Sequence, residues 1–209
     1  TFRSWQTTER TIRTVSSEIF GEVTRDAASR TRAHLGAAVP ALAFLSSLER
    51  RAVRVGDEAV LPRLLSMLEA NPGFSWVSYG DAEGAFGAAY RPEPGRVRLN
   101  TSFIALGHTV LDEVDLDAAH ARTPFRHDDD SGYDPRTRPW YRLAVESGRR
   151  VWLPPYVFFP QGIPGITCAE PQRDERGEVA GVYTIDFDLG ALSRFVAEME
   201  PSAHGQVFL

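Results

Sequence analysis

Apolar residues in the first quarter of the chain recur at intervals of three and four, as they do along one face of a helix. They are Ile12, Val15, Ile19, Val23, Ala27, Leu35, Val39, Leu42 and Leu45. The stripe predicts a helix over residues 6–48, which at about 1.5 Å per residue would be roughly 60 Å long. A compact domain of this chain length has a radius of gyration of roughly 17 Å, so the helix should extend beyond the globular part. Two helices broken near Gly36 and Pro40 are the alternative, because proline interrupts helical hydrogen bonding.

Residues 58–70 carry a shorter helical pattern that ends at Asn71-Pro72-Gly73. Strand-like runs follow, and segments of the type Asp-x-x-Gly at residues 81–84 and 174–177 have the composition of tight turns. Neighbouring strands joined by such turns pair antiparallel. The expected strands are 74–80, 85–91, 96–103, 152–159, 163–171 and 177–189.

Residues 107–132 show no clear period and are longer than most loops in compact domains. Long irregular segments of this kind are often functional. We therefore expect this segment to cover a binding site on the sheet.

Residues 131–144, SGYDPRTRPWYRLA, combine a turn with the start of a helix. Pro135 keeps the residue before it out of the α region, and Pro139 suits the first position of a helix that ends before Gly148. The segment also surrounds Trp140 and Tyr141 with arginines. A guanidinium fixed beside an aromatic pair is a pre-oriented fork for a carboxylate or phosphate. The alternative is that Trp140 packs in the core and the arginines pair with local acids.

The closing strand, residues 177–189, presents two different faces because strand side chains alternate. One face is apolar and should pack on helices; it holds Gly181, Tyr183, Ile185, Phe187 and Leu189. The other face holds Val182, Thr184, Asp186 and Asp188. A carboxylate is costly to bury without a partner. We therefore expect Asp186 to face water, a positive side chain such as an arginine of residues 131–144, or a ligand that carries a cation.

Composition narrows the classes of function. A net charge of −5 and the lack of a basic stripe argue against a nucleic-acid partner. The single cysteine, Cys168, excludes an internal disulfide and a cysteine-built zinc site, and its apolar surroundings predict a buried strand residue. Residues 127–130, His-Asp-Asp-Asp, are interpreted as a charged loop, because four consecutive residues cannot all converge on one ion. We predict neither a metal nor another cofactor.

Three segments resemble one family in the expected order. DPRTRPWYRLA at residues 134–144 is similar to the signature of the Cache superfamily, specifically the first, membrane-distal module of double-Cache sensors. GFSWVSYGDAEGAF at 73–86 resembles the first hairpin of such modules, and GEVAGVYTIDFDLGAL at 177–192 resembles their closing strand and exit helix. These modules are extracytoplasmic ligand-binding domains of bacterial transmembrane receptors.

In the members that bind amino acids, an arginine, a tryptophan and a tyrosine of the signature hold the ligand carboxylate. The resemblance assigns these roles to Arg138, Trp140 and Tyr141. A tyrosine, an aspartate two residues later and an aspartate of the closing strand hold the amine, and Tyr156 and Asp186 match two of these three. Phe158 stands where the third should be an acid. The departure favours an amino acid with an apolar side chain, or a small carboxylate without an amine.

The resemblance implies an α+β fold with a long N-terminal helix packed on an antiparallel, PAS-like (Cache) sheet. Residues 1–55 would be a stalk and dimer helix, 56–200 the sensor module and 201–209 the start of a following, truncated segment. The implied protein is a periplasmic sensor of a small carboxylate- or amine-bearing metabolite. It would form a homodimer in a receptor anchored in the inner membrane, with a cyclase, kinase or chemoreceptor output.

Two other classes of function stay open on the residues alone. One is a dimerising spacer module that takes no ligand. The other is a hydrolase using Asp186 with His127 or His108, which requires an acid and a base at hydrogen-bonding distance.

Overall fold

The computed structural model of the chain describes residues 21–22, 24–48, 53–158 and 162–199. The chain divides into two compact units. One comprises Thr1–Gly36 with Leu192–Leu209, and the other comprises Ala37–Ala191. The second unit contains the sheet and the candidate site.

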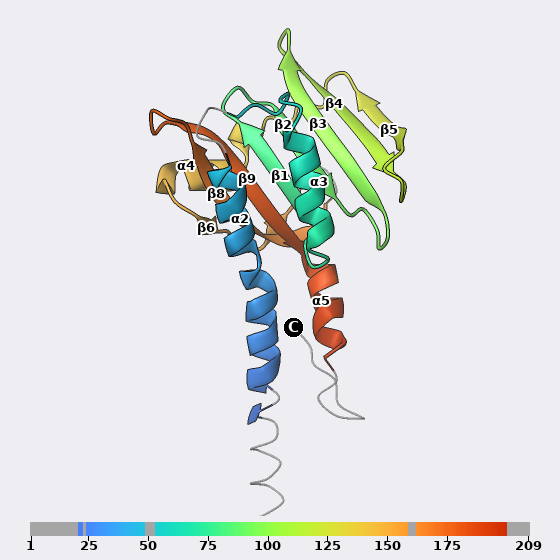
Figure 1. Cartoon of the computed structure of the whole chain (residues 1–209), viewed down its shortest axis with the longest axis vertical. Helices are drawn as coiled ribbons and strands as arrows, with labels where there is room; N and C mark the ends of the chain where they lie inside the picture. The colour runs from blue at the N-terminus through green and yellow to red at the C-terminus, as the bar shows by residue number, and fades with distance from the viewer. Residues whose placement is uncertain (1–20, 23, 49–52, 159–161, 200–209) are drawn as a thin grey trace, which may run out of the picture. The chain divides into compact units, whose positions relative to one another are not determined.

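The unit Ala37–Ala191 is built on one antiparallel sheet, in which the described residues form nine strands (Figure 1). The strands are β1 (Trp76–Asp81), β2 (Phe86–Tyr90), β3 (Val97–Ala105), β4 (His108–Leu116), β5 (Arg122–Asp128), β6 (Val151–Trp152), β7 (Tyr156–Val157), β8 (Pro164–Arg173) and β9 (Val179–Asp188). Their spatial order is β5-β4-β3-β2-β1-β9-β8-β6, and β7 also pairs with β8. The first and last long strands therefore lie side by side at the centre.

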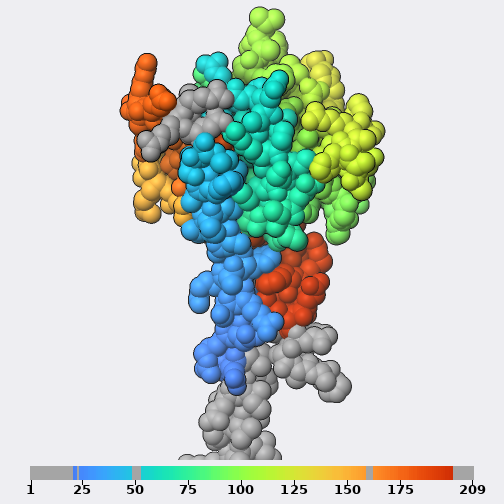
Figure 2. Space-filling model, viewed as in Figure 1, coloured from blue at the N-terminus to red at the C-terminus, as the bar shows by residue number. Residues whose placement is uncertain are grey.

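Helices cover both faces of the sheet. The helices are α2 (Ala38–Ser47), α3 (Val60–Ala70), α4 (Pro139–Ser147) and α5 (Leu189–Ala197), with a 3-10 turn, η1 (Pro135–Thr137), before α4. On one face, α2 contacts β8 and β9 while α3 contacts β1 and β2; the side chains of α2 and α3 cover this face in Figure 2. Leu42 and Leu64 from these helices and Ile185 from β9 are fully buried there. On the other face, α4 contacts β8 and β9.

Several predicted features are present. Pro139 is the first residue of α4, and Gly148 ends the helix in the left-handed conformation at φ 61°. The turn at residues 174–177 closes with a hydrogen bond from the amide of Gly177 to the carbonyl of Asp174. Cys168 is fully buried on β8. The architecture is the predicted α+β fold with an antiparallel sheet.

The prediction for residues 107–132 was wrong. This segment contains β4 and β5, which extend the sheet at one edge instead of lying over it. Residues 152–159 were predicted as one strand, but the structure has the two short strands β6 and β7. Pro154 and Pro155 separate them, because proline cannot donate to a strand ladder.

The helical stripe at the N-terminus is described in part. Residues 24–36 are helical, and α2 follows a turn at Ala37. The turn lies three residues before Pro40, whose ring nitrogen cannot donate to the carbonyl of Gly36. In the unit Thr1–Gly36 with Leu192–Leu209, the rings of His34 and Phe195 stack at a centroid distance of 4.0 Å.

Parts of the predicted domain organisation lie outside the described residues. These parts are the stripe positions Ile12, Val15, Ile19 and Val23 and the segment 201–209. The boundaries proposed for the helix and the sensor module, 1–55 and 56–200, stay predictions. None of the described helices is both long and apolar enough to cross a membrane.

Candidate functional site

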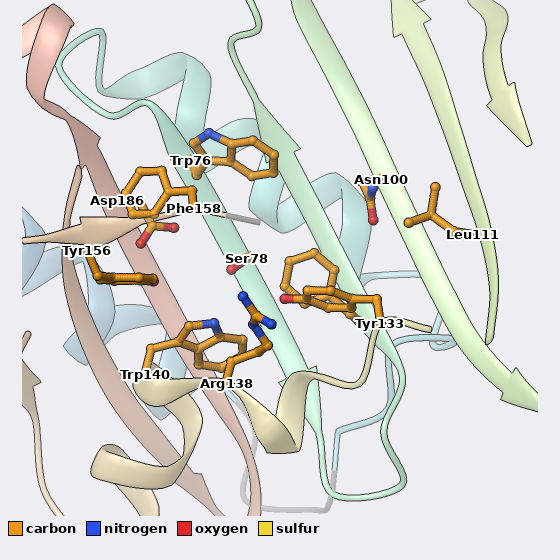
Figure 3. Close-up of a pocket in the computed structure, with 11 residues that line it drawn as sticks. Trp76, Ser78, Asn100, Leu111, Tyr133, Arg138, Trp140, Tyr156, Phe158 and Asp186 are labelled. Carbon is orange, nitrogen blue, oxygen red and sulfur yellow. The ribbon is translucent and has the colours of Figure 1, made fainter. Parts of the chain in front are cut away.

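A cavity lies on the sheet face that carries α4 (Figure 3). It is lined by Trp76, Ser78, Phe86, Asn100, Leu111, Tyr133, Arg138, Trp140, Tyr156, Phe158 and Asp186. The empty space is about 550 Å³ up to its open mouth. It is narrow, and we call it the slot.

The cover of the slot differs from the sequence prediction. Tyr133, Arg138 and Trp140 come from the turn that precedes α4 and from its first residues, and further cover comes from Tyr156 and Phe158. Residues 107–132 contribute one lining side chain, from β4. The turn before α4 therefore covers the slot, which is the role predicted from the sequence for residues 107–132.

One feature fixes the shape of that turn, and a second lets it lie close to the sheet. The guanidinium of Arg136 binds both oxygens of Asp134, at 3.0 Å from Nε to Oδ1 and 2.8 Å from Nη2 to Oδ2, and this lowers the pKa of Asp134. Gly80 lets the turn approach closely. A Cβ at Gly80 would lie 2.8 Å from Pro135 Cβ and 2.9 Å from Trp140 Cη2. Arg136 is therefore bound within the turn, as the sequence alternative proposed for the arginines.

Arg138 takes a different place. It is the extended residue, at φ −80° and ψ 148°, between η1 and α4, so a proline-started element fixes it on each side. Its guanidinium carbon lies 5.7 Å from the centroid of the Tyr133 ring, a cation–π distance. Tyr133 is buried, which raises its pKa, while the charge of Arg138 opposes the shift. Arg138 is half-buried and lines the cavity.

Asp186 is a buried carboxylate, with 8% of its surface exposed. Its Oδ1 accepts a hydrogen bond from the hydroxyl of Thr167 on β8, directly opposite in the register, and its Oδ2 accepts one from Thr184 at 3.2 Å. Burial raises the pKa of Asp186 to about 7, although both hydroxyl hydrogen bonds favour the charged form. The sequence predicts that Asp186 faces water, a positive side chain or a ligand that carries a cation. The structure shows a covered face on which threonines hold the carboxylate, and the ligand stays a prediction.

The hydrogen bonds continue beyond the two threonines. The hydroxyl of Tyr156 lies 3.0 Å from that of Thr167, and the hydroxyl of Ser78 lies 2.5 Å from that of Thr184. Each hydroxyl has one proton to donate. When Asp186 is ionised, both threonines donate to it, so Tyr156 and Ser78 must donate to the threonines. A chain of four hydroxyls then directs its protons at one carboxylate.

Phe158 forms part of the apolar wall. Its ring meets that of Tyr156 edge to face at a centroid distance of 5.2 Å. It also lies directly over the backbone of Gly165, where a Cβ would be 2.0 Å from Phe158 Cζ and 2.8 Å from the carbonyl oxygen of Phe187. Gly165 is therefore needed for this packing.

The cavity brings together five of the six residues predicted for the site: Arg138, Trp140, Tyr156, Phe158 and Asp186. Tyr141 is buried but is not a lining residue. It packs edge to face on Trp140 at 5.6 Å, and burial together with the carboxylate of Asp81 raises its pKa to about 12. In this structure Tyr141 supports the wall and does not form it.

Sequence reasoning missed six lining residues: Trp76, Ser78, Phe86, Asn100, Leu111 and Tyr133. A signal existed for the first two. They alternate on the first strand of the predicted hairpin, and in the register Trp76 faces Asp186 while Ser78 faces Thr184. Pairing the first strand with the closing strand would have placed both at the site.

The hydrolase arrangement is not formed. His127 hydrogen-bonds to Asp112 at 2.7 Å and to Asp129 at 2.9 Å, which raises its pKa, and His108 pairs with Asp130 at 3.2 Å. Neither histidine pairs with Asp186. Within the described ranges, no cluster of three or more histidine, cysteine or acidic side chains is arranged to hold a metal ion.

Residues 116–194 match the family model of the first PDC sensor domain of methyl-accepting chemotaxis protein-like receptors. The chain is similar to the methyl-accepting chemotaxis protein McpA of Pseudomonas putida, with 37% identity over 83 residues, which are 38% of this chain and 12% of McpA. It is also similar to adenylate cyclase 1 of Rhizobium meliloti, with 39% identity over 70 residues, which are 34% of this chain and 10% of the cyclase. The chain thus spans about a tenth of the length of these relatives.

Solved chemoreceptor domains share the fold. The ligand-binding domain of the amino-acid chemoreceptor PctC of Pseudomonas aeruginosa, in complex with GABA, superposes with a TM-score of 0.56 at 24% identity, over 83% of this chain and 64% of that one. The ligand-binding domain of CtaA of Pseudomonas fluorescens, in complex with L-serine, gives a TM-score of 0.58 at 20% identity, over 89% and 65%. At these identities the likeness supports the fold, while the family rests on the sequence match. The match over residues 116–194 and the shared fold are those of a sensor domain of the Cache (PDC) type.

Proposed function

We propose that the chain is the extracytoplasmic ligand-binding part of a bacterial transmembrane receptor, and that its cavity holds an amino acid. The observation that carries the proposal is the pairing of opposite charges in one slot. Arg138 supplies a guanidinium and Asp186 a buried carboxylate, and aromatic rings form much of the wall between them (Figure 3). A molecule with a carboxylate and an ammonium group satisfies both.

The two charged groups have distinct tasks in this arrangement. The guanidinium of Arg138 binds the ligand carboxylate, where planar donors match planar acceptors. Ionised Asp186 accepts from the ligand ammonium. Hydrogen bonds to charged groups contribute roughly 1.5–3 kcal/mol each, and the aromatic walls strengthen them by excluding water. Trp140 and Tyr156 border the bound molecule, and Tyr141 acts by orienting Trp140.

The structure favours an amine-bearing ligand over a carboxylate without an amine. With Asp186 ionised, the protons of Ser78 and Tyr156 point along the hydroxyl chain, so the lone pairs of these two groups are left for the cavity. Lone pairs accept from an ammonium, but they have no proton to donate to a carboxylate. The ligands named for the PctC and CtaA domains, GABA and L-serine, both carry an amine and a carboxylate.

A melting experiment on the 209-residue chain tests the proposal. The standard L-amino acids are compared with their matched 2-hydroxy acids and their decarboxylated amines. At a ligand concentration a hundredfold above the dissociation constant, stabilisation is about 2.7 kcal/mol. At least one amino acid should stabilise the chain more than both of its matched analogues do. A folded chain that responds to none of the panel contradicts the proposal and leaves a spacer module as the function.

The receptor context is part of the proposal. The similarity to McpA and to adenylate cyclase 1 supports a membrane-anchored parent with either a chemotaxis or a cyclase output. We propose a homodimer that pairs through the N-terminal helix, on the basis of the apolar stripe. Removing residues 1–30 should halve the mass measured by light scattering and leave the sheet unit folded. A truncated chain that stays dimeric, or that does not fold, contradicts the role of this helix.

A further inference from the structure

A polar residue lies across the cavity from Asp186. Asn100 on β3 lines the slot with only 4% of its surface exposed, and Figure 3 shows it on the opposite side from Asp186. Its amide nitrogen donates to Glu113 Oε1 at 3.2 Å. Its Oδ1 is buried and has no hydrogen-bond partner among the residues that the structure describes. The slot therefore presents a fixed acceptor at this end.

An unpaired buried acceptor is costly for a fold, so it calls for an explanation. Ser102, on the same face of β3, has an unpaired buried hydroxyl as well, but Ser102 does not line the cavity. The two residues differ in that only Asn100 lines the slot, so only Asn100 can accept a hydrogen bond from a ligand. Ser102 is therefore the matched control for substitutions at Asn100.

The charge behind Asn100 selects the kind of donor. Glu113 is a carboxylate with 4% exposure, and its Oε1 accepts from two neutral groups, the hydroxyl of Tyr90 at 2.6 Å and the amide of Asn100. Three arginines line a neighbouring pocket with Glu113, and each of them binds other groups. Arg98 binds Asp115 at 2.7 Å, Arg126 binds Asp128 at 2.5 Å, and Arg91 donates to the backbone carbonyls of Phe74 and Leu68. The Asn100–Glu113 pair thus forms a negative end, which favours a cationic donor over a neutral one.

The sheet sets the length of the ligand. Asn100 stands on β3 and Asp186 on β9, with β2 and β1 between them. Adjacent strands are about 4.8 Å apart, so the three spacings amount to about 14 Å across the sheet. The register also offsets the two residues by two positions along the strands, because Asn100 is in line with Thr184 and not with Asp186. At about 3.4 Å per residue this offset is about 7 Å, so the two backbones are about 16 Å apart. A hydrogen bond of about 3 Å at each end leaves roughly 10 Å between the two donors of the ligand. A side chain as short as that of alanine cannot bridge this span, and a narrow slot favours an unbranched one.

We propose that Asn100 and Glu113 form a second recognition centre of the site, which selects an amino acid with a long, unbranched side chain ending in an ammonium or guanidinium group. The inference rests on the proposed function, because Arg138 and Asp186 hold the α-carboxylate and α-amine of the same ligand. A ligand with a cationic side chain differs from the amino acid with an apolar side chain that the sequence favoured. Phe158 still supplies an apolar wall, but the far end of the slot is polar.

Calorimetric titration of the 209-residue chain tests the inference with three probes: L-arginine, L-citrulline and L-norleucine. Citrulline has nearly the shape of arginine without the charge, and norleucine has an unbranched chain without a donor. Arginine should bind about 10- to 100-fold more tightly than norleucine, as expected for one charge-assisted hydrogen bond. Citrulline should lie between them.

Variants locate the effect. Asn100→Leu should bring the ratio of arginine to norleucine affinity close to one, whereas Ser102→Ala should leave the ratio unchanged. Glu113→Gln keeps the shape and removes the charge, so it should weaken arginine while sparing citrulline. It serves as the second test if Asn100→Leu does not fold.

The outcomes separate the two proposals. A wild-type chain that binds norleucine as tightly as arginine overturns this inference and leaves an amino-acid site in place. A ratio that survives in both Asn100→Leu and Glu113→Gln also overturns it. A chain that binds no amino acid overturns the proposed function itself, and the inference falls with it.

Discussion

Replacing Asp186 by asparagine should change how stability depends on pH. Burial raises the pKa of Asp186 to about 7 in the folded chain. An aspartate in an unfolded chain has a pKa of about 3.9, so the difference is about 3 pKa units. At 1.36 kcal/mol per unit, the ionised carboxylate makes the folded chain less stable by about 4 kcal/mol once the pH exceeds 7.

The sign follows from proton binding. Between pH 4 and pH 7 the folded chain holds a proton on Asp186 that the unfolded chain has lost. The stabilisation from Asp186 is therefore fully present below about pH 4 and is lost as the pH rises through about 7. This is the reverse of a salt-bridged aspartate, because here burial outweighs the hydroxyl hydrogen bonds.

Urea unfolding of the parent chain and of Asp186→Asn, at pH 5, 6, 7 and 8, measures the effect. The amide has the shape of the carboxyl group and does not titrate. The free energy of unfolding of the variant relative to the parent should rise by a few kcal/mol from pH 5 to pH 8. Thr167→Val supplies a control of known sign. This variant removes a hydrogen bond to the ionised form of Asp186, which raises the pKa of Asp186 further. The loss of stability that the parent chain shows with rising pH should therefore occur at higher pH in Thr167→Val. A difference between Asp186→Asn and the parent that is constant across this range would refute the reasoning.

Three further changes have defined outcomes. Arg138→Ala should weaken an amino-acid ligand by about one to two decades while leaving the unliganded melting temperature nearly unchanged; a collapsed unliganded chain that still responds to ligand would make Arg138 structural. Asp188→Ala should cost about 1 kcal/mol in urea unfolding, because Asp188 Oδ1 accepts from the amide of Ala191 at 2.8 Å in the first turn of α5, and an unchanged value would exclude this cap. Cys168 is fully buried, which raises its pKa to about 12, so thiol reagents at pH 8 should modify it only after denaturation, and rapid labelling of the native chain would contradict its position.

The sequence predicted those elements whose signals are local. Pro139 and Gly148 define both ends of α4, and the hairpin of β1 and β2 follows from its turn residues. It missed β4 and β5 because their pattern depends on a distant partner. β5 is almost wholly exposed, so it has no buried face to produce an alternation. β4 carries acids at several positions, and its pairing with β5 shifts register between Glu113 and Val114. The pairing of β4 with β5 therefore becomes visible only in the folded sheet and not in the sequence.

The candidate site divides in the same way. Arg138 and Asp186 were found because a resemblance and a lone mid-strand carboxylate pointed to them. The environment of Asp186 could not be predicted, since its partner Thr167 depends on the register of β8 against β9. Asn100 carried no signal at all. Its importance comes from burial and an unpaired oxygen, which exist only once β3 is placed beside β2.

The hydroxyl chain also determines which ligand the cavity accepts at a given pH. When Asp186 is ionised, all four hydroxyl protons point towards it, and the cavity sees lone pairs on Ser78 and Tyr156. When Asp186 is protonated, it can donate to Thr167, which then donates to Tyr156, and the phenol proton turns towards the cavity. The same groups thus change from acceptors for an ammonium into a donor for a carboxylate or hydroxyl. Since the pKa of Asp186 lies at about 7, preference for an amino acid over its 2-hydroxy acid should fall about tenfold per pH unit below 7.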